Sequence, residues 1–246
     1  MYQLTPPNEH LDFGFGITSE TYYGSAKLLN EQKKNIQAFQ LVEMPISFLY
    51  RHSIELALKS LIIIFHKKLQ IPYEKESFES KKPKIFTQGK WRPLYSCHFI
   101  DELYKYWKDE LLLKHLDKIK ELAPNGDWNE FIEISKAIPI ISYYDKKSSF
   151  FRYPVTENET LDLEKFTMKE IDVENLFKML NSKEAPKTEK NGAKIIYGIK
   201  DEGDNIFKAY EQQKELLTEL TESLIKVTEY FYGIHIMTRM TLCDGQ

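Results

Sequence analysis

Apolar side chains recur every three or four residues along most of this chain, the spacing of one face of an α-helix. Together with the capping residues before them, they predict helices at about 18–40, 45–69, 96–116, 127–134, 172–180 and from 204 toward the C-terminus. The first two are separated by a short connection, so we expect them to form an antiparallel pair.

Other stretches lack this period. Residues 72–95 are polar and contain helix breakers, which is typical of a long surface loop. Residues 138–166 are rich in aromatic and β-branched side chains and predict irregular or extended structure with a small strand pair. Asn191-Gly192 favours a hairpin turn, with a strand over 193–199. The sequence therefore predicts a mainly α fold, one domain over 1–246, with insertions at about 72–95 and 138–203.

Composition narrows the class of protein. With 246 residues and 42% hydrophobic residues, the chain can bury a substantial core. A formal net charge of -3 argues against a surface that binds nucleic acid everywhere, so any contact with a polyanion would be local. Two distant cysteines, no visible signal peptide and no apolar run near the roughly 20 residues that span a bilayer predict a cytoplasmic protein without a membrane segment.

The predicted second helix is apolar nearly all round, yet Arg51, His52, Glu55 and Lys59 form a polar stripe on it. An arginine fork, an imidazole, a carboxylate and an ammonium could recognise a phosphodiester and transfer a proton. Alternatively, Glu55 pairs with Arg51 and Lys59 inside the bundle, and His52 is a neutral core residue. The sequence leaves both interpretations open.

Three segments carry a resemblance to a known family: 48–59 with its polar stripe, His98 before an amphipathic helix, and the aromatic segment 150–154 around Arg152. Together they resemble the HEPN-type helical proteins of bacteria. The resemblance implies a helical bundle acting on RNA, often as a homodimeric, metal-independent ribonuclease of toxin–antitoxin or anti-phage defence systems. Family members that have lost the Arg-x(4-6)-His motif only bind RNA, a nucleotide or a partner protein.

The resemblance also implies roles for particular residues. His52 or His98 would deprotonate a ribose 2′-hydroxyl, while Arg51 and Arg152 would stabilise charge on the phosphate. Arg92 and His98 have the family spacing, although Pro93 and a cap at Ser96 place Arg92 outside the helix. From the residues alone, we favour a packing role in which Arg152 pairs with Glu55. Neither a metal nor a cofactor is expected.

Cations and aromatic rings alternate in the segment 81–95, a combination that holds phosphates and stacks unpaired bases. Its alternative is an ordinary solvated loop anchored by its rings. The predicted RNA-binding residues are Lys59, Lys84, Lys90, Trp91 and Arg92. The sequence thus leaves three functional hypotheses: a ribonuclease, an inactive binding module with RNA, a nucleotide or a cognate protein as its partner, and a structural helical subunit.

Overall fold

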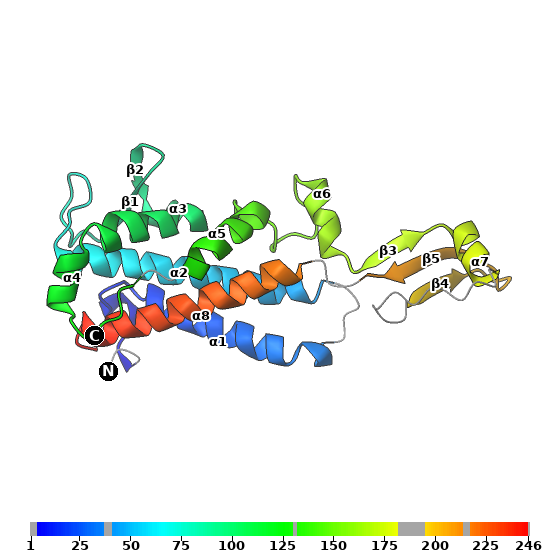
Figure 1. Cartoon of the computed structure of the whole chain (residues 1–246), viewed down its shortest axis with the longest axis horizontal. Helices are drawn as coiled ribbons and strands as arrows, with labels where there is room; N and C mark the ends of the chain where they lie inside the picture. The colour runs from blue at the N-terminus through cyan, green and yellow to red at the C-terminus, as the bar shows by residue number, and fades with distance from the viewer. Residues whose placement is uncertain (1–3, 37–40, 130–131, 182–194, 214–216, 246) are drawn as a thin grey trace.

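The computed structural model describes residues 4–36, 41–129, 132–181, 195–213 and 217–245. It is mainly helical, with small antiparallel sheets, so the predicted mainly α class is confirmed. A helical bundle occupies one end of the molecule and a small sheet projects from it (Figure 1). Within the described part of the chain, none of the helices is both long and apolar enough to cross a bilayer.

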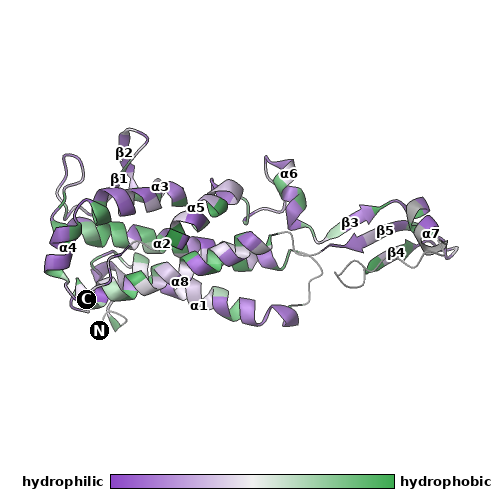
Figure 2. Ribbon diagram, viewed as in Figure 1, coloured by the Kyte–Doolittle hydropathy of each residue, from purple (hydrophilic) through white to green (hydrophobic). Residues whose placement is uncertain are grey.

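The centre of the bundle is α2, flanked by α1 and α8. Their bounds are Phe15–Glu31 for α1, Glu43–Leu69 for α2 and Thr218–Thr241 for α8. Every residue from 53 to 66 is buried, because α1, α3 and α8 all pack against α2. Figure 2 colours much of α2 as hydrophobic. The predicted antiparallel pair of α1 and α2 is confirmed.

Shorter helices complete the bundle. They are α3 (Ile100–Lys105), a π-helical continuation (Tyr106–Leu113), α4 (Leu116–Leu122) and α5 (Ile132–Asp145). The ring of Trp107 meets Phe231 of α8 at 5.4 Å and Phe65 of α2 at 6.2 Å between centroids. This aromatic contact joins three layers of the bundle.

The projecting part holds most of the β-structure. It comprises α6 (Glu159–Asp162), β3 (Met168–Ile171), α7 (Val173–Asn181), β4 (Ile196–Lys200) and β5 (Ile206–Gln212). The strands are antiparallel in the order β3-β5-β4. A separate hairpin of β1 (Lys84–Thr87) and β2 (Lys90–Pro93) lies within the segment predicted as a loop.

Both ends of α1 differ from the prediction. The helix begins at Phe15 rather than near residue 18, because Asp12 accepts hydrogen bonds from the backbone N–H groups of Gly14 at 3.2 Å and Gly16 at 2.7 Å. These contacts satisfy the donors of the first turn. The helix ends at Glu31, well short of residue 40, and 37–40 lie outside the described residues.

The third helix also starts later than predicted. Ser96 belongs to a short 3-10 turn, and α3 begins at Ile100. The helix predicted at 127–134 corresponds to α5, which begins at Ile132 and continues to Asp145.

The prediction of irregular or extended structure over 138–166 is wrong for 138–145, because α5 continues through Pro139 to Asp145. Proline inside a helix removes one hydrogen bond and usually ends or kinks it. Here Ile134, Ile138 and Ile141 lie at helical spacing and are buried against the bundle. Tertiary packing therefore outweighs the local preference.

The prediction of a helix from Asp204 is wrong as well. Asp201 Oδ1 accepts hydrogen bonds from the N–H groups of Gly203 and Asn205, both at 2.9 Å, and Asp204 has a φ of 65°. These contacts form a tight turn between β4 and β5, so α8 starts only at Thr218. β4 confirms part of the strand predicted at 193–199, whereas Asn191-Gly192 lies outside the described residues.

A buried polar cluster ties the N-terminal turn to α2 and α8. Asp12 forms an ion pair of 2.7 Å with Arg239 and accepts a hydrogen bond of 2.5 Å from the Ser60 hydroxyl. His235 Nε2 lies 3.8 Å from the same carboxylate. Burial alone would raise the pKa of Asp12, but His235, Arg239 and Ser60 together hold that pKa well below its usual range. The cluster thus contains an ionised carboxylate that three elements share.

Gly16 leaves room for this cluster. A Cβ atom at Gly16 would stand 2.1 Å from His235 Nε2 and 2.7 Å from Asp12 Oδ2. We therefore expect Gly16→Ala to lower the free energy of unfolding by about 1–3 kcal/mol, measured by urea denaturation.

Gly24 is the matched control, because it lies in the same helix and a Cβ atom there would meet nothing within 4 Å. Gly24→Ala should raise the free energy of unfolding by about 0.5–1 kcal/mol, since alanine favours the helix. Equal effects of the two substitutions would contradict the role of Gly16.

The same cluster predicts a pH dependence of stability. Burial alone would lower the pKa of His235, but its contacts with Asp12 and Glu20 outweigh burial and raise that pKa, against the charge of Arg239. A raised pKa stabilises the fold most below the unfolded value of about 6.5, and this contribution is lost as the pH rises through the folded value. The difference in unfolding free energy between the wild type and His235→Gln should therefore shrink from pH 5.5 to 8.5. A difference that stays constant over this range would refute the assignment.

Candidate functional site

Glu55 lies at the centre of a second buried network. Its Oε2 accepts a hydrogen bond from Arg51 Nη1 at 2.5 Å, and its Oε1 accepts from Lys59 Nζ at 2.8 Å. The same Oε1 lies 2.9 Å from Nδ1 of His98. The predicted pairing of Glu55 with Arg51 and Lys59 is confirmed, and α2 places the three side chains together through its i,i+4 spacing.

Arg51 carries the network to two further segments. Its Nη2 donates to the backbone carbonyl of His98, and its Nε lies 3.0 Å from Asp145 Oδ2 at the end of α5. Asp145 also accepts a hydrogen bond of 2.8 Å from the N–H of Phe150. Two cations and two carboxylates therefore balance in the core.

The electrostatics of Glu55 follow from these contacts. Burial alone would raise the pKa of Glu55, but the charges and hydrogen bonds of Lys59 and Arg51 lower it to about 2. Glu55 is therefore an ionised carboxylate at neutral pH.

The network is sealed on its inner side. Arg51 has 0% exposed surface, Glu55 1% and Lys59 2%. Lys59 also donates to the carbonyl of Tyr95 at 3.3 Å, so its ammonium has a backbone partner in addition to Glu55. Since none of the three can touch a dissolved substrate in this conformation, their burial favours the structural interpretation of Arg51, Glu55 and Lys59.

His98 is the outer end of the network. Its side chain is 46% exposed, while its Nδ1 contacts the buried Glu55 carboxylate. This contact leaves Nε2 as the ring atom that can meet a substrate. An exposed imidazole oriented by a carboxylate has the geometry of a general base.

His52 lies beside the stripe and not within it. Its ring stacks on Phe48 at 5.7 Å and meets Tyr22 edge-on at 4.6 Å. Burial lowers the pKa of His52 despite the nearby charge of Glu55, and the positive charge of Arg152 lowers it further. His52 is therefore a largely neutral, half-buried ring, as the structural interpretation expects.

Arg152 is exposed and lies over the ring of Phe48, with 5.6 Å between its guanidinium carbon and the ring centroid. The expected pair of Arg152 with Glu55 is wrong, because Arg51, Lys59 and His98 occupy that carboxylate. Arg152 is thus a solvent-facing cation over Phe48, the residue whose ring stacks on His52.

The predicted RNA-binding hairpin is partly engaged with itself. Lys84 forms ion pairs with Glu74 at 3.1 Å and Glu76 at 2.7 Å. Arg92 lies on β2, outside any helix as the sequence indicates, and donates to Gln88 at 2.8 Å.

Trp91 is half-buried and packs edge-on against Phe86 and Tyr106. Lys90 is exposed. Among the described residues, the structure gives no ion pair for Lys90 or for Arg92, and only Arg92 of these two has a hydrogen bond given within the hairpin.

Sequence reasoning missed Asp145, because it assigned that position to irregular structure. A signal was present, since Asp145 follows Ile138 and Ile141 at helical spacing and so continues their buried face. It also missed Asp12 and Arg239 as partners, because they are 227 positions apart and nothing local marks their contact.

Removing the central carboxylate should be costly. Glu55→Gln leaves Arg51 and Lys59 buried with excess positive charge, so we expect a loss of about 3–5 kcal/mol in unfolding free energy. Urea denaturation followed by circular dichroism measures this loss.

Glu133→Gln is the matched control, because Glu133 pairs with Lys226 at 2.8 Å on the surface, where both side chains are half exposed. Its loss should stay below about 1 kcal/mol. A Glu55→Gln variant as stable as this control would contradict the buried network.

Comparison with known proteins found no matching family model, no matching curated protein and no matching solved structure. The function of this chain is therefore inferred from the chemistry of the described side chains, with His98 and its carboxylate as the starting point.

Proposed function

We propose that this chain is a HEPN-like protein that acts on RNA as a metal-independent endoribonuclease of the type used in bacterial defence or toxin–antitoxin systems. One observation carries the proposal: the half-exposed His98 ring is held at Nδ1 by a buried, ionised Glu55. A carboxylate in this position fixes the tautomer and orientation of the imidazole, so that Nε2 can accept a proton.

The reaction consistent with this geometry is an internal transesterification. His98 Nε2 takes the proton of a ribose 2′-hydroxyl, and the 2′-oxygen forms a bond to the adjacent phosphorus. The bond from phosphorus to the 5′-oxygen of the next nucleotide breaks, and that oxygen takes up a proton from the His98 imidazolium. The products are a 2′,3′-cyclic phosphate and a free 5′-hydroxyl. The step as proposed uses neither a metal ion nor a water molecule.

Arg152 would supply the positive charge that the phosphate needs. Arg152 is exposed, and its positive charge contributes to the lowered pKa of His52, which lies one turn before Glu55 on α2. In the proposed homodimer, a second chain would bring a second His98 to the same RNA strand, as the family resemblance implies. Arg51 and Glu55 then act as positioning residues behind His98.

The second candidate is an inactive HEPN-like module that binds RNA, a nucleotide or a partner protein. The burial of Arg51 and Lys59 favours it, because two of the cations expected to hold the phosphate are at most 2% exposed. In that case the network serves packing alone, and His98 is an outer hydrogen-bonding residue.

The test is incubation of the full chain with total RNA and tRNA in EDTA. The ribonuclease predicts fragments that end in 2′,3′-cyclic phosphate, and His98→Ala should slow cleavage at least about a hundredfold, the usual contribution of a general base. His115→Ala at the start of α4 is the matched control and should cleave at the wild-type rate.

Arg152→Ala should slow cleavage while leaving the unfolding free energy within about 0.5 kcal/mol of the wild type, because Arg152 is exposed. Intact RNA with measurable binding would reject catalysis in favour of the binding module. Cleavage that survives His98→Ala would reject the role of His98.

A further inference from the structure

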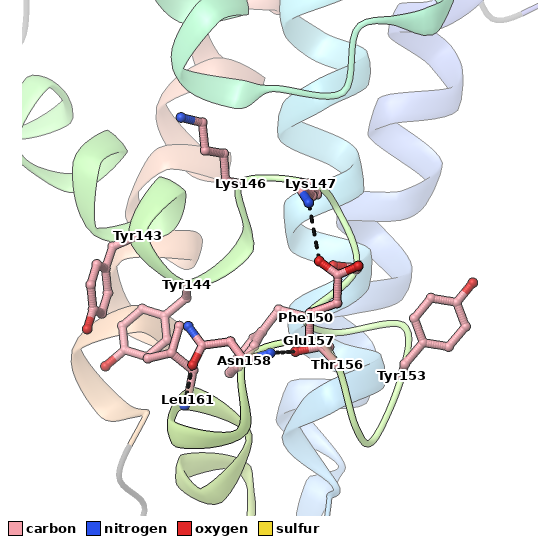
Figure 3. Close-up of a pocket in the computed structure, with 11 residues that line it drawn as sticks. Tyr143, Tyr144, Lys146, Lys147, Phe150, Tyr153, Thr156, Glu157, Asn158 and Leu161 are labelled. Atoms are coloured by element: carbon pink, nitrogen blue, oxygen red, sulfur yellow. Dashed lines mark hydrogen bonds and ion pairs between the residues drawn. The ribbon is translucent and has the colours of Figure 1, made fainter.

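A surface pocket lies between the end of α5 and the segment that leads to α6, away from the hairpin predicted to bind RNA (Figure 3). Its volume is about 490 Å³. It is lined by aromatic side chains, two lysines and several small polar groups: Tyr143, Tyr144, Lys146, Lys147, Ser149, Phe150, Tyr153, Thr156, Glu157, Asn158 and Leu161. Figure 3 shows Tyr143 and Tyr144 on one side, Tyr153 on the other and both lysines along one edge.

The walls of this pocket are fixed by buried contacts. Asp162 accepts hydrogen bonds from the N–H and the hydroxyl of Thr156, the latter at 3.0 Å. Lys165 pairs with Asp162 at 2.5 Å, donates to the carbonyl of Tyr153 at 2.9 Å and lies 4.2 Å from the ring centroid of Phe150. A segment with so many mutual contacts forms a preorganised wall.

The floor of the pocket is apolar and its rim is aromatic. Phe150 and Leu161 are buried, whereas Tyr143 is 67% exposed and Tyr153 is 56% exposed. Tyr144 is held in the wall by a hydrogen bond of 2.9 Å from its hydroxyl to Glu164. Exposed tyrosine faces above an apolar floor suit a planar ring.

The charged groups at the rim favour an anion. Lys147 and Glu157 form a pair of 3.3 Å in which both side chains are largely solvated, so a ligand anion can replace Glu157 at little cost. Lys146 is exposed, and no ion pair is recorded for it among the described residues. Asn158 uses its Oδ1 to accept from the Leu161 N–H at 3.2 Å, which leaves its NH₂ group as a donor.

We propose that this pocket binds one nucleotide unit, with its base stacked against the exposed face of Tyr153 and its phosphate between Lys146 and Lys147. Both a free mononucleotide and a nucleotide within single-stranded RNA supply this chemistry. The RNA arm of the proposal rests on the proposed function, because it makes the pocket a second contact for the strand that His98 would cut. The mononucleotide arm stands without it.

Binding is measured without cleavage. Fluorescence anisotropy of the wild-type chain with a labelled 2′-O-methyl octanucleotide avoids the reaction, because the attacking hydroxyl is blocked. Calorimetry with AMP and UMP tests the free nucleotides. Tyr153→Ala and Lys146→Ala should each weaken binding of the preferred probe about tenfold, the usual scale for one stacked base or one phosphate contact.

Tyr197→Ala on β4 and Lys27→Ala on α1 are the matched controls, since both positions are exposed and neither residue lines the pocket. They should bind as the wild type does, and all four variants should unfold at the wild-type urea midpoint. Binding of the octanucleotide alone identifies RNA as the source, whereas comparable binding of AMP or UMP identifies a mononucleotide.

Two results would overturn the pocket: no binding of any probe, or binding that Tyr153→Ala and Lys146→Ala leave unchanged. These results are independent of the His98 experiment. A chain that cleaves RNA with unchanged affinity in the pocket variants keeps the proposed function and loses the pocket. A chain that binds nucleotides here but never cleaves keeps the pocket and loses the ribonuclease.

Discussion

The fold depends on keeping the charge of Glu55 compensated inside an otherwise apolar helix. A buried carboxylate is tolerated only when cations and donors surround it, and here they are Arg51 and Lys59 of α2 itself and His98 of the segment before α3. Arg51 is paired in turn with the Asp145 carboxylate at the end of α5. Ser60, the residue directly after Lys59, joins the Asp12 cluster from the same helix. Two polar clusters on α2 therefore set the register of the helices around it, a task that apolar packing alone specifies less sharply.

Whether a contact could be predicted from the sequence depends on how far apart its two residues lie along the chain. The stripe of Arg51, Glu55 and Lys59 could be predicted because i,i+4 spacing on one helix makes them neighbours in any fold. The helical spacing of Asp145 marks it as part of a buried face, but its pairing with Arg51 and the pairing of Asp12 with Arg239 could not be predicted, since each contact joins distant parts of the chain. Pro139 misled the local analysis because the burial of its neighbouring isoleucines outweighs the lost hydrogen bond.

The same reasoning separates positioning from chemistry at the candidate site. Arg51 and Lys59 stand out in the sequence as charged residues on an apolar helix, yet both side chains are buried and cannot reach a dissolved substrate. His98 looked less distinctive in sequence, because its role depends on the distant Glu55 carboxylate. A buried polar stripe on an apolar helix thus marks the residues that position a site. The exposed group that contacts the stripe marks the place where a substrate can bind.

Asp145 connects the network around Glu55 with the pocket beside α5. One of its carboxylate oxygens lies 3.0 Å from Arg51, and the other accepts the N–H of Phe150 at 2.8 Å. Phe150 is the buried floor of the pocket, and Lys165 lies against its ring. A substitution that removes Arg51 therefore takes away one of the contacts of the carboxylate that also holds Phe150. The network behind His98 and the pocket beside α5 are thus connected through Asp145, although no residue of the network lines the pocket.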